Sequence, residues 1–133
     1  SSVNGLANAP RAVAYDASKA GLLSLARSIA VDFGPHGVRA NAVCPGWVVT
    51  PMGDQDMDAM AAARGISRDD AYRLASAAVP LRRPASADEI ASCCLFLASD
   101  DSSIVTGTAL VADGGGGAVE LASIAFAPDD TTS

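Results

Sequence analysis

The sequence predicts an α/β fold with a parallel sheet, and three observations support that prediction. A helical pattern over residues 15–33 leads into a short strand over residues 38–44. A second helix, which begins near Ser86, is followed by a strand at residues 109–112. Turn residues, glycine and proline above all, separate these segments. A buried strand that closely follows a helix is typical of α/β units, because parallel strands need a crossover between them.

The composition fits one domain and excludes several classes of protein. The chain has 133 residues, of which 50% are hydrophobic, and this length suffices for a single core. The net charge of −6 disfavours a nucleic-acid binder, which needs a basic face. No apolar run approaches the roughly 18 residues of a membrane span. The start lacks a basic segment and an apolar segment, so we expect no signal peptide there.

The first helix is predicted from Tyr15 to Phe33, after a loop over residues 1–14. Apolar residues recur at helical spacing, namely Leu22, Leu25, Ala26, Ile29, Ala30 and Phe33. On a helical wheel Tyr15 and Lys19 share the inward side with Leu22, Ala26 and Phe33. The opposite, solvated side is predicted to hold Asp16, Arg27 and Asp32. Glycine and proline at residues 34–37 end the helix.

Later segments are predicted in the same way. Proline and glycine at residues 45–46 end the first strand. Residues 47–80 include a helix that starts at Ser67 and is closed by Pro80. Ser86 and Glu89 form a capping box. Residues 113–117 end the second strand, and the glycine run at residues 114–117 is predicted to be a flexible turn. The tail, residues 128–133, is expected to be frayed.

The three cysteines, Cys44, Cys93 and Cys94, do not form a disulfide framework. An odd number with one adjacent pair is a poor set for bridging, and the only histidine, His36, leaves no metal cluster. We therefore expect no metal site and three small buried hydrophobic side chains. A reducing, cytoplasmic location follows as an expectation.

The only lysine of the chain, Lys19, lies four residues after Tyr15. On a helix this spacing places both side chains on one face, with Cβ atoms about 5–6 Å apart. An ammonium beside a phenol stabilises the phenolate, which would make Tyr15 a proton donor and acceptor near neutral pH. The simpler interpretation is a tyrosine packed at a helix start beside a lysine whose charged end reaches solvent.

Further residues extend this pattern into a family resemblance. Ser2 lies thirteen residues before Tyr15, and Ser18 directly precedes Lys19. Residues 38–50 read VRANAVCPGWVVT, a strand followed by a Pro-Gly-x-Val-x-Thr loop, and residues 80–84, 87–91, 96–100, 106–107 and 113–115 continue the match in order. Together these motifs resemble the C-terminal half of a classical short-chain dehydrogenase/reductase. The resemblance implies a doubly wound, Rossmann-like parallel sheet, incomplete here because the N-terminal cofactor half is missing.

The resemblance also implies a role for each matching residue. Tyr15 would exchange a proton with the substrate oxygen, Lys19 would stabilise its phenolate and hold the nicotinamide ribose, and Ser2 would hydrogen-bond the substrate. The nicotinamide end of NAD or NADP would be lined by the loop after the first strand, at Pro45, Gly46, Val48 and Thr50. The implied reaction is hydride transfer between this cofactor and a secondary alcohol or ketone.

Two features of the family have no counterpart in the sequence. The Gly-rich phosphate turn is absent, and residues 114–117 do not replace it, because Val119 stands where glycine or alanine is needed. The family's catalytic asparagine is also absent, since Asn4 and Asn8 are too close to Ser2. We therefore expect the chain by itself to be inactive.

Residues 1–117 would then be part of one catalytic domain, with residues 118–133 as a tail. Residues 47–80 would form the substrate lid, in which Trp47, Met52, Met57 and Met60 favour a modest, partly apolar substrate. Ordinary packing of two short helices explains the methionines equally well. His36 and the pair Arg82–Arg83 are interpreted as surface turn residues, although the arginines could meet an anionic substrate.

The expected partners are an alcohol or ketone and further copies of the whole protein, as a homodimer or homotetramer. Nucleic acid and membrane are not expected partners. Two other functions stay open. One is a non-catalytic interaction module that keeps only the oligomerisation elements, and the other is an epimerase- or dehydratase-type family member.

Overall fold

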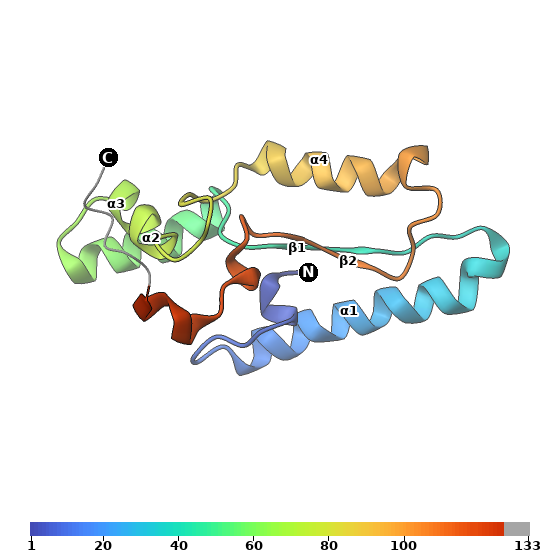
Figure 1. Ribbon diagram of the computed structural model, residues 1–133, viewed down its shortest axis with the longest axis horizontal. Coiled ribbons are helices and arrows are strands. Elements are labelled where there is room, and N and C mark those ends of the chain that lie inside the picture. The colour runs from blue at the N-terminus through green and yellow to red at the C-terminus, as the bar shows by residue number, and fades with distance from the viewer. Residues whose placement is uncertain (127–133) are drawn as a thin grey trace.

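The computed structural model describes residues 1–126, which form a small parallel sheet with helices on both faces (Figure 1). The helices and strands in chain order are α1 (Val13–Phe33), β1 (Ala42–Pro45), α2 (Pro51–Arg64), α3 (Arg68–Ala75), α4 (Ala87–Ala98) and β2 (Ala109–Ala112). Short 3₁₀ turns lie at Val3–Gly5, Gly34–His36, Asp100–Ser102, Gly116–Ala118 and Leu121–Phe126. The predicted tail, residues 128–133, lies outside the described residues.

The two strands pair in parallel, with a register that runs from Ala42 opposite Ala109 to Pro45 opposite Ala112. Figure 1 shows α4 over one face of this sheet and α1 over the other, while α2 and α3 lie beyond the carboxyl ends of the strands. This arrangement confirms the predicted fold class, an incomplete doubly wound α/β sheet. In such sheets the carboxyl ends of the strands are where ligands bind.

Helix α1 matches the predicted segment but buries a different face. It ends at Phe33 as expected, and Gly37 takes the left-handed conformation (φ 78°) that ends the turn after it. The buried apolar residues are Leu23 and Ala30, which lie seven positions apart. The predicted inward residues Leu22 and Phe33 are exposed, because the face that contacts β1 is rotated from the one that the wheel selected.

The first strand is shorter than predicted, since residues 38–41 lie outside it. Ala40 and Asn41 bond instead to the segment before β2, partly through side chains. The Ala40 N–H donates to Thr106 Oγ1 (3.1 Å) and the Asn41 amide donates to the Val105 carbonyl (2.9 Å). These side-chain bonds replace the backbone ladder until the regular pairing begins at Ala42.

The helix starts confirm the capping prediction. Ser86 accepts from the Glu89 N–H while the Glu89 carboxylate accepts from the Ser86 N–H, and Ser67 with Asp70 forms the same box at α3. The helix that starts at Ser67 ends at Ala75, before the predicted end at Pro80.

Apolar burial is divided between two clusters. One lies between α1 and the sheet and contains Leu23, Ala42 and Cys44. The other lies between α2 and α3 and contains Met57, Ala71 and Tyr72. The helices α2 and α3 therefore pack mainly against each other, through a cluster that is distinct from the one at the sheet.

Arg39 joins the end of α4 to the segment before β1. Its Nη1 donates to the Leu97 carbonyl (2.9 Å), to Ser102 Oγ (2.9 Å) and to the Val105 carbonyl (3.1 Å), and its Nη2 donates to the Ser99 carbonyl (3.0 Å). The cation thus binds carbonyls at the C-terminal end of a helix, where positive charge is favourable.

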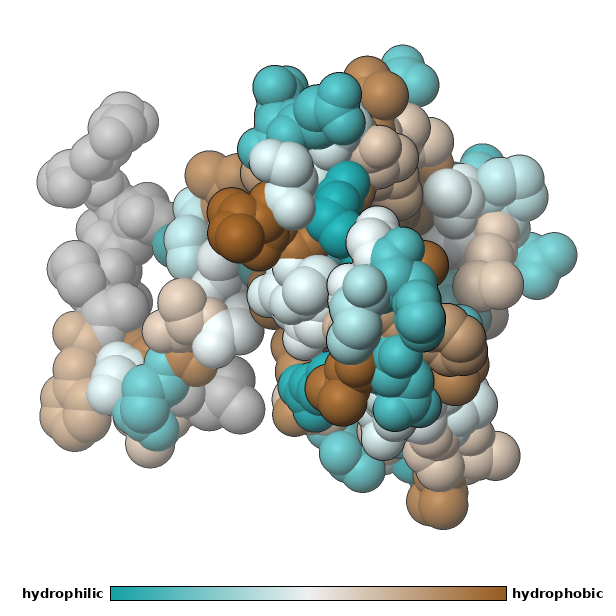
Figure 2. Space-filling view, turned by 90° about the vertical axis from the view of Figure 1, so that its right-hand side faces the viewer, coloured by the Kyte–Doolittle hydropathy of each residue, from teal (hydrophilic) through white to brown (hydrophobic). Residues whose placement is uncertain are grey.

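The cysteine prediction is partly wrong. Cys44 is buried, but Cys93 is only half-buried and Cys94 is exposed, because α4 covers the sheet with one face only. Other apolar residues are exposed too, and Figure 2 shows them interspersed with polar ones over one side of the molecule. No helix within residues 1–126 is both long and apolar enough to cross a membrane.

Candidate active site

Tyr15 and Lys19 lie on one face of the first turns of α1. The Lys19 Nζ atom is 5.0 Å from the centroid of the Tyr15 ring, within the range of a cation–π contact. Tyr15 is 44% exposed and Lys19 is half-buried, so the phenol remains accessible to a small molecule. Within residues 1–126 no ion pair uses the Lys19 ammonium, which leaves its charge available to the tyrosine and to a ligand.

The loop that contains Ser2 lies against this part of α1. Ser2 precedes a 3₁₀ turn at Val3–Gly5, and its Oγ accepts from the Asn4 N–H (3.2 Å). Ser1 Oγ donates to the Lys19 carbonyl (2.9 Å). A Cβ on Gly5 would lie 2.9 Å from that same carbonyl oxygen, so only glycine allows this approach. Among the described contacts Ser2 has no hydrogen bond to Tyr15 or Lys19.

Asp16, predicted to be solvated, is 3% exposed, and that prediction was wrong. Its carboxylate accepts from Asn4 Nδ2 (2.8 Å) and from the Ala9 N–H (3.1 Å). The loop before α1 folds back over this side of the helix and supplies both donors. No local pattern in the sequence signals this burial, because both donors come from a separate loop.

The predicted cofactor residues follow the carboxyl end of β1. Pro45 is the last residue of the strand, and a Cβ on Gly46 would lie 3.0 Å from that of Asp113, so the loop passes close to the end of β2. Val48 bridges to Ala85 in parallel, and Thr50 Oγ1 caps α2 by accepting from the Gly53 N–H (3.2 Å). The structure therefore holds this loop in place on three sides.

The glycine run after β2 is anchored, in contrast to the predicted flexible turn. The Asp113 carboxylate accepts from the Gly115 N–H (2.9 Å) and the Gly117 N–H (2.6 Å). Gly114 and Gly115 adopt positive φ angles of 69° and 92°, and both pack against residues 79–81. Two of the N–H groups that could bind an anion are thus bound within the turn.

The residues assigned to the lid differ in their surroundings. Trp47 and Met52 are 40% and 69% exposed, whereas Met57 is fully buried between α2 and α3 and Met60 packs against the same cluster. Met57 therefore contributes to helix packing, which is one of the two interpretations that the sequence left open for the methionines. The outward residues Trp47 and Met52 remain available to a ligand.

A network of polar side chains connects α2 and α3 at their surface. Tyr72 donates to Asp54 (3.0 Å), and Arg68 donates to Asp58 from Nε (2.6 Å) and Nη2 (2.7 Å). Burial, with the bond to the Asp54 carboxylate, raises the pKa of Tyr72. The bond from Arg68 lowers the pKa of Asp58. Tyr72 is thus held neutral as a structural donor.

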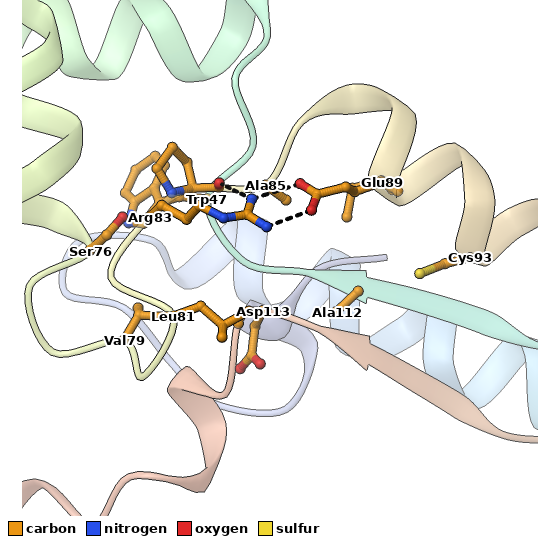
Figure 3. A pocket seen from close by; sticks show the side chains of 13 residues that line it. Trp47, Ser76, Val79, Leu81, Arg83, Ala85, Glu89, Cys93, Ala112 and Asp113 are labelled. Atoms are coloured by element: carbon orange, nitrogen blue, oxygen red, sulfur yellow. Dashed lines mark hydrogen bonds and ion pairs between the residues drawn. The ribbon is translucent and has the colours of Figure 1, made fainter.

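A cavity of about 150 Å³ lies beside Trp47, between the end of α3, the start of α4 and the end of β2 (Figure 3). Arg83 and Glu89 form an ion pair at this cavity (2.6 and 2.8 Å), and the pair lowers the pKa of Glu89 to about 2. The cavity is not lined by Ser2, Tyr15 or Lys19. It is therefore separate from the candidate catalytic residues.

The site offers side chains that are suited to proton transfer. Among residues 1–126 no group of three or more His, Cys, Asp or Glu side chains is placed to hold a metal ion. A phenol next to an ammonium, with a hydroxyl on the adjoining loop, is suited to moving a proton at an oxygen atom.

Comparisons with known proteins bear on the family of the chain. A family model described as enoyl-(acyl carrier protein) reductase matches residues 1–116. The chain is 50% identical to Protein MoaE of Klebsiella aerogenes over 126 residues, which is 95% of this chain and 49% of that protein.

Solved structures agree as well. A short chain dehydrogenase family protein of Francisella tularensis superposes with a TM-score of 0.84 at 35% identity, covering 89% of this chain and 49% of that one. An actinorhodin polyketide ketoreductase variant with NADPH gives a TM-score of 0.80 at 30% identity, covering 90% and 46%. The chain thus spans about half the length of the relatives it matches. The motifs, the fold and these matches together show that the chain belongs to the short-chain dehydrogenase/reductase family.

Proposed function

We propose that this chain supplies the catalytic residues of an NAD- or NADP-dependent oxidoreductase that interconverts a secondary alcohol and a ketone. The observation on which the proposal rests is the Lys19 ammonium 5.0 Å from the Tyr15 ring, on an exposed face of α1 that also receives the Ser2 loop. Membership in a family that contains the NADPH-bound ketoreductase supports the assignment.

In the proposed mechanism the protein's residues handle the proton. A nicotinamide, when bound, supplies or accepts the hydride at the substrate carbon. In the oxidation direction the Tyr15 phenolate takes the proton of the alcohol oxygen, and in reduction the phenol returns it. The Lys19 charge stabilises the phenolate, and the Ser2 hydroxyl donates to the substrate oxygen, which becomes the carbonyl oxygen after oxidation.

We propose that the loop after β1 holds the nicotinamide end of such a cofactor. Pro45, Gly46, Val48 and Thr50 follow the carboxyl end of a parallel strand, where ligands of doubly wound sheets bind. The close packing of Gly46 on Asp113 and the Thr50 cap hold this loop in one conformation. The chain has no Gly-rich phosphate turn, so we propose that a preceding dinucleotide-binding half contributes the pyrophosphate site.

We propose a modest, partly apolar substrate under a lid formed by residues 47–80. Trp47 and Met52 are the exposed apolar side chains of this segment that could contact it. In a fusion protein that restores a preceding dinucleotide-binding half, the M52S variant should then change the relative kcat/KM values for small and large ketones. The matched control is Q55S, which alters another exposed residue of α2 and should leave those ratios unchanged.

We further propose that residues 1–117 belong to one catalytic domain, residues 118–133 to a tail, and that the whole protein is a homodimer or homotetramer. Several large apolar side chains are exposed on α1 and α4, and we propose that association or the rest of the protein covers them. The largest exposures on these helices are those of Val13, Leu25, Val31 and Leu95.

The proposal is tested with two preparations. One is the 133-residue chain, and the other is a fusion protein, in which the same chain follows the part of its Klebsiella aerogenes relative that the chain does not match. We expect NAD(P)H formation on a panel of secondary alcohols from the fusion and none from the chain alone. A folded fusion that binds NAD(P)H without turning over any alcohol or ketone would contradict the proposal.

A further inference from the structure

A buried carboxylate lies directly beside the candidate proton donor. Asp16 is 3% exposed, although it follows Tyr15 in the first turn of α1. A buried charge is costly unless hydrogen bonds compensate it. Both donors to Asp16, Asn4 Nδ2 at 2.8 Å and the Ala9 N–H at 3.1 Å, come from the loop that contains Ser2. The charge of Asp16 is therefore satisfied by that loop.

Asn4 connects this carboxylate to the Ser2 hydroxyl. An ionised carboxylate only accepts hydrogen bonds, so Asn4 must turn its Nδ2 toward Asp16, which leaves its Oδ1 for Ser2. Ser2 Oγ lies 3.4 Å from this Oδ1 and accepts from the Asn4 backbone N–H at 3.2 Å. The Ser2 hydroxyl therefore accepts one hydrogen bond from the Asn4 backbone and directs its own proton toward the Asn4 side chain.

The contact of Asn4 with Asp16 is stronger than its contact with Ser2. The 2.8 Å bond to the carboxylate is short and charge-assisted, whereas the 3.4 Å contact at Ser2 is long and weak. Asp16 therefore holds the Asn4 amide firmly, while the Ser2 proton can leave its weak contact for a substrate oxygen. The Ser1 bond to the Lys19 carbonyl fixes the same loop one turn further along α1.

We propose that Asp16 and Asn4 are positioning residues that hold the Ser2 hydroxyl ready for the substrate oxygen. This inference rests on the proposed function, because it assigns Ser2 to the substrate oxygen. Neither residue needs to touch substrate or cofactor. Asp16 orients Asn4, and Asn4 orients Ser2.

An exchange of the two side chains tests the proposal. N4D places a second carboxylate next to that of Asp16, so that the two acceptors repel each other. D16N replaces one carboxylate oxygen by an NH₂ group, which then faces the donor of either Asn4 or Ala9. The double variant N4D/D16N restores one amide–carboxylate bond in the reverse direction, with the new amide oxygen free to accept from Ala9. D32N is the matched control, because Asp32 is an exposed acid on the same helix.

In the fusion protein we expect each single variant to lower kcat about tenfold or more, as the loss of one aligned hydrogen bond implies. KM for the alcohol should stay within about twofold, and the double variant should recover most of kcat. D32N should not change kcat. A kcat loss that follows the melting temperature without recovery in the double variant would overturn the proposal, as would unchanged kcat in both single variants.

Amide exchange in the 133-residue chain separates this inference from the proposed function. We expect the Ala9 N–H and the Asn4 side-chain N–H to be protected in the native sequence. Protection at Ala9 should be lost in both single variants and regained in the double variant. If the native fusion shows no turnover while this exchange pattern is observed, the proposed oxidoreductase function is wrong, but Asp16 and Asn4 still restrain the Ser2 loop. If Ala9 exchanges freely in the native chain, the positioning role is excluded.

Discussion

The Lys19 ammonium lies 5.0 Å from the centroid of the Tyr15 ring, one helical turn apart on α1. The chain's other basic side chains are mostly arginines on its outer surface, and several form ion pairs with acids, as Arg68 does with Asp58. Lys19 differs from these arginines, because its ammonium contacts the ring of Tyr15 and pairs with no acid among the described residues. This contact between a compact charge and an exposed phenol is the observation on which the proposed proton transfer rests.

The first prediction concerns this charge. In the fusion protein K19M should lower kcat/KM by about 100-fold or more, because the proton-transfer group loses its stabilising cation. K19R retains the charge but replaces a compact ammonium by a planar fork, and it should recover only part of the activity. Steady-state rates measured with alcohol and ketone decide this. Full activity in K19M would show that the ammonium plays no part.

The second prediction compares two glycines in thermal unfolding. G5A should lower stability by about 1–3 kcal/mol, because its Cβ would lie 2.9 Å from the Lys19 backbone oxygen. G21A should raise stability by about 0.5–1 kcal/mol, because no atom lies within 4 Å of its Cβ and helices favour alanine. Equal effects at the two positions would contradict the close docking of the Ser2 loop.

The third prediction concerns the junction at Arg39. R39M should lower the free energy of unfolding by about 1.5–3 kcal/mol, because it leaves Ser102 and several carbonyls without their donor. R27M changes an exposed arginine of α1 and should stay within about 0.5 kcal/mol of the native protein. Denaturant unfolding of both variants provides the measurement. A loss no larger in R39M than in R27M would rule out this role.

The fourth prediction is a pH dependence at the start of α4. The Arg83 guanidinium and the Ser86 N–H lower the pKa of Glu89 from 4.5 to about 2. A lowered pKa means that Glu89 contributes stability above about pH 4.5, and the contribution is lost as the pH falls through about 2.

NMR titration of the Glu89 carboxyl should therefore give a midpoint near 2. R83Q should move the midpoint upward, toward 4.5, while R73Q, which alters an arginine paired with Asp70 instead, should not. An ordinary midpoint in the native chain would show that the ion pair does not form in solution.

Local sequence patterns predicted most elements of this fold. The capping box at Ser86 and the turn after Phe33 depend on residues within a few positions, and both are present. The spacing of Tyr15 and Lys19 on one helix likewise determined that their side chains would be neighbours.

Features that depend on distant partners were not predictable in this way. Asp16 is buried because the loop folds back and supplies Asn4 and Ala9 as donors. Met57 is buried because α3 packs against α2. The face of α1 that is buried is determined by its contact with β1, which a helical wheel does not contain.

The most direct test of the proposed chemistry is the Y15F variant of the fusion protein. Formation of NAD(P)H from a secondary alcohol should fall by about 10²–10⁴-fold, while NAD(P)H binding and the melting temperature remain close to those of the unmodified fusion. That result would assign the proton transfer to the Tyr15 hydroxyl. Turnover unchanged by Y15F would contradict the account, because no other described group near Lys19 would then explain the reaction.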